Sequence, residues 1–190
     1  MAERDNLCPY LHLPVQAGSD RILKAMRRQY DKTWYLNLVE EIRARVPEIA
    51  FSSDVIVGFP GETEEDFEHT LDVVRQVEYD TLFSFRFSPR PGTPAEGMEP
   101  VPEEVARERH QRLLNTQLEI QTRRFQAVVG KTVEVLVEGQ SKKGGQFSGR
   151  SRDNKVVNFT SDAPVAVNDL VSVRVTHSHV NSLRGEAHLS

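Results

Sequence analysis

The sequence is short of cysteine and of long apolar runs, and each shortage excludes a class of protein. Cys8 is the single cysteine among 190 residues, so no internal disulfide forms, and one thiol cannot supply the roughly four ligands of a structural zinc or iron–sulfur site. No stretch approaches the roughly 18 apolar residues of a membrane span, and the polar N-terminus is unlike a signal peptide. We therefore expect a cytoplasmic protein with no membrane partner and with Cys8 as a free thiol.

Charge and pattern divide the chain into two parts. The whole chain has a formal charge of −4; up to Ala127 it has 16 basic and 22 acidic residues, and after Ala127 it has 8 and 6. Strand and helix patterns alternate in the first part, whereas the second part has short β-rich runs and no helical period. We expect one domain at residues 1–128 and another at 129–190.

The first part reads as strands alternating with helices. Apolar runs predict strands at 10–15, 49–57 and 81–87, and helical spacing predicts helices at 20–28, 32–46 and after Thr63, with Asp31 and Thr63 as N-caps. This order favours parallel strands joined by helices, in which ligands bind at the carboxyl ends of the strands. The loops at that edge are 16–19, 58–62 and 88–94, and a long helix should follow from near 101 to about 127.

The second part reads as a small all-β domain. Short apolar runs at 132–137, 146–149, 156–159, 170–175 and 182–187 are separated by Gly, Asn and Asp turns. Closing five short strands on themselves removes their exposed edges. We therefore expect a five-stranded barrel of the oligonucleotide-binding kind.

Three features of the first part have both a functional and a structural interpretation. The loop Gly58-Phe-Pro-Gly-Glu62 follows an apolar strand, so its amides could face an anionic or nucleoside ligand, although glycine also punctuates ordinary turns. Asp54 lies among apolar neighbours and is either a ligand-binding carboxylate or half of an ion pair. His12 is expected to be a hydrogen-bonded packing residue, because no other Cys or His lies at a ligand spacing from it.

A basic cluster marks the second part. Lys142, Lys143, Arg150, Arg152 and Lys155 fall within fourteen residues, interleaved with Phe147, Asn154, Asn158 and Phe159. Cations neutralise phosphates, and aromatic or amide groups beside them can stack on or read exposed bases. Binding of RNA and a solvated hairpin remain equal alternatives on this pattern. His177 and His179 are a pair without carboxylate or thiol support, which is weak evidence for a metal site.

Five motifs together resemble one enzyme family. They are His12-Leu-Pro-Val-Gln-Ala-Gly-Ser19, Ser53-Asp-Val-Ile-Val-Gly-Phe-Pro-Gly-Glu-Thr63, Phe87-Ser-Pro-Arg-Pro-Gly-Thr-Pro-Ala95, Ser148-Gly-Arg with Val156-Val-Asn-Phe159, and Asn181-Ser-Leu-Arg-Gly185. In order and spacing they resemble the radical S-adenosylmethionine methylthiotransferases, from about Cys8 onward. The Arg90-Pro91 step resembles the members that act on tRNA.

The resemblance implies a fold and a function. Family members carry two 4Fe–4S clusters on six cysteines, and neither cysteine set is present here, so the resemblance implies a C-terminal piece with no cluster of its own. The implied fold is the last part of a TIM-type radical barrel, at 1–128, followed by a TRAM domain at 129–190. The implied activity of the whole enzyme is methylthiolation of C2 of an isopentenylated adenosine next to the anticodon, with S-adenosylmethionine as cofactor. We expect this chain alone to be inactive.

The resemblance also implies which residues bind. For S-adenosylmethionine these are Gln16, Ser19 and Gly58 at the strand ends, with Asp54 and Arg86 on neighbouring strands contacting cofactor or substrate. For the anticodon stem-loop of tRNA they are Arg90, Arg150, Arg152, Lys155, Asn158 and Arg184. No catalytic residue and no metal ligand is expected in this chain.

Two other functions compete with this interpretation. The chain could be a self-sufficient RNA-binding protein that acts through its TRAM domain, with the first part as a scaffold. It could also be a small α/β enzyme with a phosphate-bearing cofactor at 58–61, although no general base is evident. In the first interpretation, three strands taken from a barrel leave an unpaired edge and an uncovered apolar face, so we expect self-association.

Overall fold

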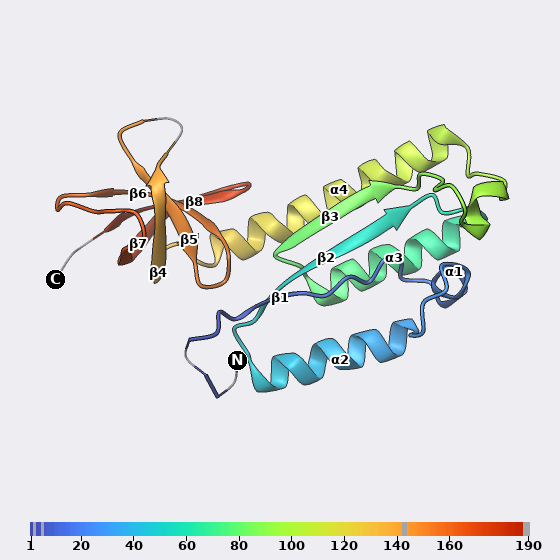
Figure 1. The fold of residues 1–190 in the computed structure, drawn as a ribbon, viewed down its shortest axis with the longest axis horizontal. Coiled ribbons are helices and arrows are strands. Elements are labelled where there is room, and N and C mark those ends of the chain that lie inside the picture. Colours follow the sequence, from blue (N-terminus) through green and yellow to red (C-terminus); the bar gives the residue numbers. More distant parts are fainter. Residues whose placement is uncertain (2, 5, 142–143, 188–190) are drawn as a thin grey trace. The chain divides into compact units, whose positions relative to one another are not determined.

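The computed structural model describes residues 1, 3–4, 6–141 and 144–187 (Figure 1). Its chain forms two compact units. The first, called here the α/β unit, consists of Leu11–Pro47 and Phe51–Ile120. The second, the barrel unit, consists of Met1–Tyr10, Glu48–Ala50 and Gln121–Ser190.

The α/β unit is built around a three-stranded sheet in the order β1-β2-β3. Strands β2 and β3 are parallel, with Ser52 beside Thr81 and Val57 beside Arg86. The predicted alternation of strands and helices, with parallel pairing, is therefore confirmed for these two strands. In chain order the elements are β1 (Tyr10–His12), α1 (Asp20–Ala25), α2 (Lys32–Arg45), β2 (Ala50–Val57), α3 (Glu64–Val77), β3 (Thr81–Arg86), the 3-10 helix η1 (Pro94–Gly97) and α4 (Glu103–Gln126).

Side-chain caps fix where two helices begin. The Asp31 carboxylate accepts a hydrogen bond from the Trp34 amide at 2.7 Å, at the start of α2. At the start of α3, Thr63 and Asp66 form a reciprocal capping box. Each cap satisfies backbone donors that a helix end otherwise leaves free, so both predicted N-caps are confirmed.

The first strand is shorter than predicted, ending at His12 instead of residue 15. Pro14 has no backbone N–H to give to a neighbouring strand, which interrupts the ladder at that point. Pairing resumes at Gln16, which forms a parallel bridge with Val55.

The two faces of the sheet differ in exposure because successive strand residues point to opposite sides. Val55 and Val57 are completely buried, while Asp54, beside Phe83 in the register, lies on the other side. Phe83 and Phe85 remain 47% and 54% exposed. We call the side that carries Asp54, Phe83 and Phe85 the open face.

The barrel unit contains the predicted closed barrel, in the order β4-β5-β6-β8-β7. Strands β6 and β8 pair in parallel, and the other neighbours pair antiparallel. The strands are β4 (Thr132–Gln140), β5 (Phe147–Ser151), β6 (Val156–Ser161), β7 (Leu170–His179) and β8 (Ser182–Ala187).

Two glycines permit close strand contact in this barrel. A Cβ on Gly149 would lie 2.2 Å from the Leu136 carbonyl oxygen, and one on Gly185 would lie 2.4 Å from that of Arg174. Gly149 and Gly185 are therefore required by packing, and alternation along the strand turns the adjacent Arg150 and Arg184 outward.

The last turn of α4 contributes to the barrel core. Phe125 is 4% exposed and packs with buried residues of the barrel such as Val157 and Leu183. The C-terminal segment of the barrel unit accordingly starts at Gln121, within α4. In the part of the chain that the structure describes, no helix is long and apolar enough to cross a membrane.

Candidate cofactor face and nucleic-acid interface

The loop after β2 is held by a buried carboxylate. The Glu62 side chain, 2% exposed, accepts a hydrogen bond from the Gly58 amide at 3.1 Å and one from Arg109 of α4 at 2.9 Å. Burial raises the pKa of Glu62, and the hydrogen bonds from Gly58 and Arg109 oppose that shift. Because Glu62 uses the Gly58 amide, this loop does not offer that N–H to an external anion, which argues against a phosphate-bearing cofactor at 58–61.

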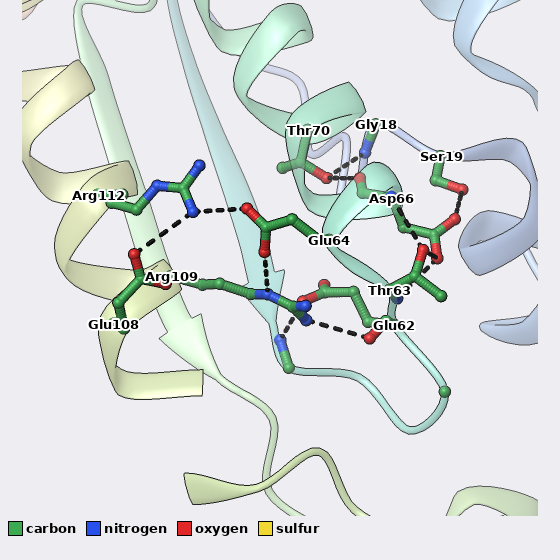
Figure 2. Close-up of polar contacts among 12 residues, drawn as sticks. Gly18, Ser19, Glu62, Thr63, Glu64, Asp66, Thr70, Glu108, Arg109 and Arg112 are labelled. Carbon is green, nitrogen blue, oxygen red and sulfur yellow. Dashed lines mark hydrogen bonds and ion pairs between the residues drawn. The ribbon is translucent and has the colours of Figure 1, made fainter. Parts of the chain in front are cut away.

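A chain of ion pairs connects this loop to two helices (Figure 2). The Nε of Arg109 lies 3.1 Å from Glu64 of α3, and the other Glu64 oxygen lies 2.6 Å from Arg112 of α4. Both guanidinium groups also lie over the Phe67 ring, at 5.9 and 5.0 Å from its centre. The cluster fixes α3, α4 and the loop as one assembly.

A second buried carboxylate organises the other side of α3. Asp66 accepts hydrogen bonds from the Ser19 hydroxyl at 2.5 Å, from the Thr63 hydroxyl at 2.6 Å and from Arg21. Burial acts to raise the pKa of Asp66, but the hydrogen bonds from Arg21, Ser19 and Thr63 outweigh it and hold the pKa far below its usual range. Asp66 therefore remains ionised and joins the loop after β1 to the start of α3.

The residues expected to bind S-adenosylmethionine meet at the carboxyl end of β2, but they differ in what they can still bind. The backbone of Gln16 pairs with Asp54 and Ile56 at 2.8 and 2.9 Å, and among the described residues its side-chain amide has no hydrogen-bond partner. Ser19 already donates its hydroxyl to Asp66. Gly58 has a φ of 75° and faces Ala106, where a Cβ would lie 2.8 Å from the alanine methyl carbon. Gly58 therefore shapes the loop by its small size and backbone conformation.

Asp54 and Arg86 lie on opposite faces of the sheet. Asp54 is on the open face, where its carboxylate lies 3.4 Å from Nε2 of His12. Arg86 is the register partner of the buried Val57 and forms an ion pair with Glu103 of α4 at 3.3 Å. A single ligand on the open face can reach Asp54, whereas Arg86 extends on the side of α4. The contact of each residue with cofactor or substrate stays a prediction, and the geometry assigns the two residues to different sides of the sheet.

His12 is a bonded side chain on the open face. Its Nδ1 is 2.9 Å from the Ser52 hydroxyl, and its ring meets that of Phe83 edge-on at 6.0 Å. Within the described ranges, no group of three or more His, Cys, Asp or Glu side chains is arranged to hold a metal ion.

The barrel unit carries a groove of about 960 Å³ on its outer surface. Among the described residues, amides, hydroxyls and two arginines line most of it, and one carboxylate, that of Glu138, lies at the β4 side. The lining residues with predicted roles are Arg150, Asn158 and Arg184. These three, predicted as RNA contacts from three separate β-rich runs, are brought to one surface by the fold.

Pairing across the strands places three groove residues in a row. Ser148 of β5 is the register partner of Asn158 in β6, and Asn158 is the partner of Arg184 in β8. Arg150 lies further along β5, where it bonds to the Asn154 side chain at 3.1 Å and lies 3.6 Å from Glu138.

The other residues predicted to contact RNA lie elsewhere. Lys155 is 6% exposed, with its ammonium bonded to Asp153 and 5.7 Å from the centre of the Phe125 ring. It could meet a phosphate only by leaving those partners, so its geometry favours a packing role, and its contact with RNA stays a prediction. Arg152 is exposed, lies outside the groove and pairs with Glu134 at 3.7 Å. Arg90 is exposed in the loop after β3, and Lys142 and Lys143 lie outside the described residues.

Sequence reasoning missed the arginines of α4. Arg109 and Arg112 looked like ordinary solvated charges on a long helix, and Glu62 looked like the end of a glycine turn. Glu62 and Arg109, which pair with each other, are 47 positions apart in the sequence. No local sequence pattern predicts a contact over that separation. The available signal was Glu62 itself, an acid directly after Gly61 in a loop that leaves an apolar strand.

Comparison with known proteins agrees with the two-part architecture. The model of the radical SAM superfamily matches residues 1–74, and the model of the TRAM domain matches residues 126–188. The chain is 52% identical over 187 residues to the tRNA-2-methylthio-N(6)-dimethylallyladenosine synthase of Acetivibrio thermocellus, covering 97% of the chain and 39% of that protein. It is 47% identical to the protein of that name from Nocardia farcinica, over 98% of the chain and 39% of the relative.

These matches run through both units in one alignment. A further relative of the same name, from Thermobifida fusca, is 50% identical over 94% of the chain and 37% of its own length. The chain thus spans about two fifths of the length of the curated relatives it matches. The sheet, the loop after β2 and the outer row of the barrel all fall within the region shared with these relatives, so the chain matches the radical SAM superfamily in its first part and the TRAM domain in its last part.

Proposed function

We propose that this chain is part of a cytoplasmic enzyme that methylthiolates C2 of an isopentenylated adenosine next to the anticodon of tRNA. The supporting observation is the alignment, at about half identity, with three relatives named as synthases of that modified nucleoside. The polar groove on the outer surface of the barrel supports it independently, because a TRAM-type barrel needs a surface that RNA can occupy.

In this proposal the barrel unit positions the RNA. Arg184, Asn158 and Arg150 form the groove contacts, and Arg152 and Arg90 supply exposed positive charge outside it. Arginine pairs with phosphate through several donors in a fixed fork, and asparagine offers both a donor and an acceptor to a base edge. Lys155 has no part in this contact.

The open face and the end of β2 fit S-adenosylmethionine in part. Asp54 is 31% exposed and the Gln16 amide is without a partner among the described residues, so both can meet a nucleoside. Ser19 and Gly58 act indirectly, since Asp66 and Glu62 occupy their hydrogen-bonding groups. Bound S-adenosylmethionine would supply both the methyl group and the radical that removes a hydrogen atom. These residues would hold and orient the bound S-adenosylmethionine.

The residues present do not fit an iron–sulfur cluster. A 4Fe–4S cluster needs about four thiolate ligands, and the sequence has Cys8 alone. We therefore propose that the chain is inactive by itself and that it supplies positioning surfaces to the whole enzyme.

Complementation in trans tests the proposed function. The segment of the Acetivibrio thermocellus relative that precedes the matched region would be reconstituted with clusters and mixed with this chain, S-adenosylmethionine, reductant and an isopentenylated anticodon stem-loop. Methylthiolated adenosine formed by the mixture, and by neither part alone, is the expected result. The intact relative serves as the active control. If the relative forms product, and this chain binds RNA but yields no product in the mixture, the result would favour a self-sufficient RNA-binding protein instead.

A binding measurement tests the partner separately. The chain would be titrated with the anticodon stem-loop in its unmodified and isopentenylated forms, across a salt series. We expect salt-sensitive binding of both forms, because the groove contacts lie in the barrel unit and are not expected to reach the isopentenyl group. Absence of binding by the folded chain at low salt would contradict a tRNA partner for this part of the enzyme.

We also propose that the chain self-associates through the open face. Phe83 and Phe85 lie there at about half exposure, two positions apart and therefore on the same side of β3. Such a pair beside Ile56 makes an apolar surface that water disfavours, and a second copy can cover it.

A further inference from the structure

Two neighbouring polar side chains in the groove lack partners. Asn158 and Arg184 are register partners on β6 and β8, and among the described residues neither the amide nor the guanidinium makes a hydrogen bond or ion pair. Arg150, by contrast, is already bonded to Asn154 and lies near Glu138. Among the described residues, the groove therefore has one committed arginine on β5, an unpartnered amide on the adjacent strand β6 and an unpartnered guanidinium beside it on β8.

The floor beside Asn158 is apolar. Val156 lines the same groove two residues earlier in β6, and residues two apart in a strand share a face. A flat heterocycle lying on Val156 would present its edge to Asn158, which offers one acceptor and two donors. An amide in this position suits the mixed donors and acceptors of a base edge better than it suits a phosphate, which has acceptors only.

Charge gives the groove a direction. Glu138 lies at the β4 side and repels a phosphate there, while Arg184 lies three strands along the row β4-β5-β6-β8. A strand spacing of about 4.8 Å puts Asn158 and Arg184 within the reach of one nucleotide. The phosphate is thus favoured at β8 and the base at β6.

We propose that this groove binds a single unpaired nucleotide of an RNA strand, with its base on Val156, the base edge on Asn158 and its phosphate on Arg184. The proposal rests on the proposed RNA-binding function and specifies the kind of RNA. In an RNA duplex the bases are stacked and paired, and a side chain cannot reach their edges through the deep major groove. A volume of about 960 Å³ accommodates a ligand of nucleotide size.

Salt dependence separates the two contacts. For single strands the slope of log K against log salt changes by about 0.7 for each phosphate neutralised. We expect Arg184→Gln to weaken binding of an unpaired loop and to reduce the slope by about 0.7. Asn158→Ala should weaken binding about tenfold with an unchanged slope, because a neutral amide releases no counterion.

Two matched variants control for general surface effects. Thr160→Ala changes an exposed residue two positions along β6, and Arg174→Gln removes an exposed charge on β7; neither residue lines the groove. Circular dichroism and thermal unfolding would show that all four variants are folded. Anisotropy titrations would use a labelled stem-loop, the fully paired duplex of the same sequence, and stem-loops with one abasic site at each loop position.

The expected pattern is tighter binding of the stem-loop than of the duplex, with one abasic position at which Asn158→Ala has no further effect. Equal binding of stem-loop and duplex, or an Asn158→Ala affinity equal to that of Thr160→Ala, would overturn the proposal. Failure of the complementation assay with this pattern intact would reject the enzymatic function and leave the nucleotide site standing.

Discussion

The guanidinium of Arg109 lies 2.9 Å from the carboxylate of Glu62, and both side chains are more than nine-tenths buried. Arg109 belongs to the long helix that leads out of the α/β unit, and Glu62 belongs to the loop at the end of β2. The pair therefore holds the conformation of the loop beside the proposed cofactor position, through the bond from Gly58 to Glu62.

Removing one partner of this pair should be costly. We expect Glu62→Ala to lower the free energy of unfolding by about 3 kcal/mol. The buried guanidinium of Arg109 would then have lost one of the two carboxylates that balance its charge. Glu62→Gln, which still accepts hydrogen bonds, should cost roughly 1 kcal/mol. Urea unfolding measures both, with the exposed Arg107→Ala on the same helix as control. A Glu62→Ala variant as stable as Arg107→Ala would refute this role.

Asp66 should make stability depend on acid pH. Burial raises the pKa of Asp66, but the hydrogen bonds from Arg21, Ser19 and Thr63 lower it by more than burial raises it. The pKa in the folded state therefore lies below the unfolded value of about 3.9. Asp66 therefore contributes stability above about pH 4, and that contribution is lost as the pH falls through the folded pKa.

The comparison of wild type with Asp66→Asn measures this contribution. At pH 7 we expect the variant to be less stable by about 2 kcal/mol, from lost capping and buried hydrogen bonds. The difference should shrink as unfolding is followed to pH 3 and below. A constant difference between pH 7 and pH 2 would show that ionisation of Asp66 has no part in it.

The barrel glycines should not tolerate a methyl group. Gly149→Ala and Gly185→Ala place a Cβ within 2.4 Å of a carbonyl oxygen of the neighbouring strand, so strands must separate. We expect each to destabilise the barrel by about 3 kcal/mol, as overpacking does in a tight core. Gly97→Ala, with no atom within 4 Å of its added Cβ, is the matched control in thermal unfolding.

Lys155 should affect stability and leave RNA binding unchanged. Lys155→Ala removes a buried ion pair with Asp153 and a contact over Phe125. We expect a loss of about 2 kcal/mol in urea unfolding, with the affinity and salt slope for RNA unchanged below the unfolding transition. A reduced salt slope in the folded variant would restore Lys155 as a phosphate contact.

The open face should control the oligomeric state. Phe83→Ser combined with Phe85→Ser should shift the chain toward monomer in sedimentation equilibrium, because the apolar area that drives association is reduced. Leu114→Ser, at a residue 42% exposed on α4, is the control for a general loss of surface hydrophobicity. A wild-type chain that is monomeric at all concentrations would contradict self-association.

Local signals predicted most of the fold. Asp31 and Thr63 predicted helix starts because an N-cap bonds to an amide three residues along the chain. Such a short-range contact can be predicted from the local sequence. The five β-rich runs marked the barrel strands because turns of Gly, Asn and Asp interrupt them. The structure ends β1 at His12, earlier than the apolar pattern predicts, because Pro14 has no N–H to give to the ladder.

The candidate site was harder to predict because side-chain direction depends on register. Asp54 and Arg86 belong to neighbouring strands, and the sequence does not show that the register puts them on opposite faces. Lys155 was counted with the basic cluster because charge is visible in a sequence and burial is not. The row formed by Ser148, Asn158 and Arg184 depends on three strand pairings that no local pattern specifies.

The alternation of glycine and arginine in the barrel has a consequence for how such a chain can change. In Ser148-Gly-Arg150 and Arg184-Gly185 the glycine faces the core and the arginine faces out. Loss or gain of one residue within either strand exchanges the two faces, burying a guanidinium and exposing the glycine position at once. Length variation is therefore confined to the connecting loops, and any change in the proposed RNA contacts must arise by substitution on the outer face.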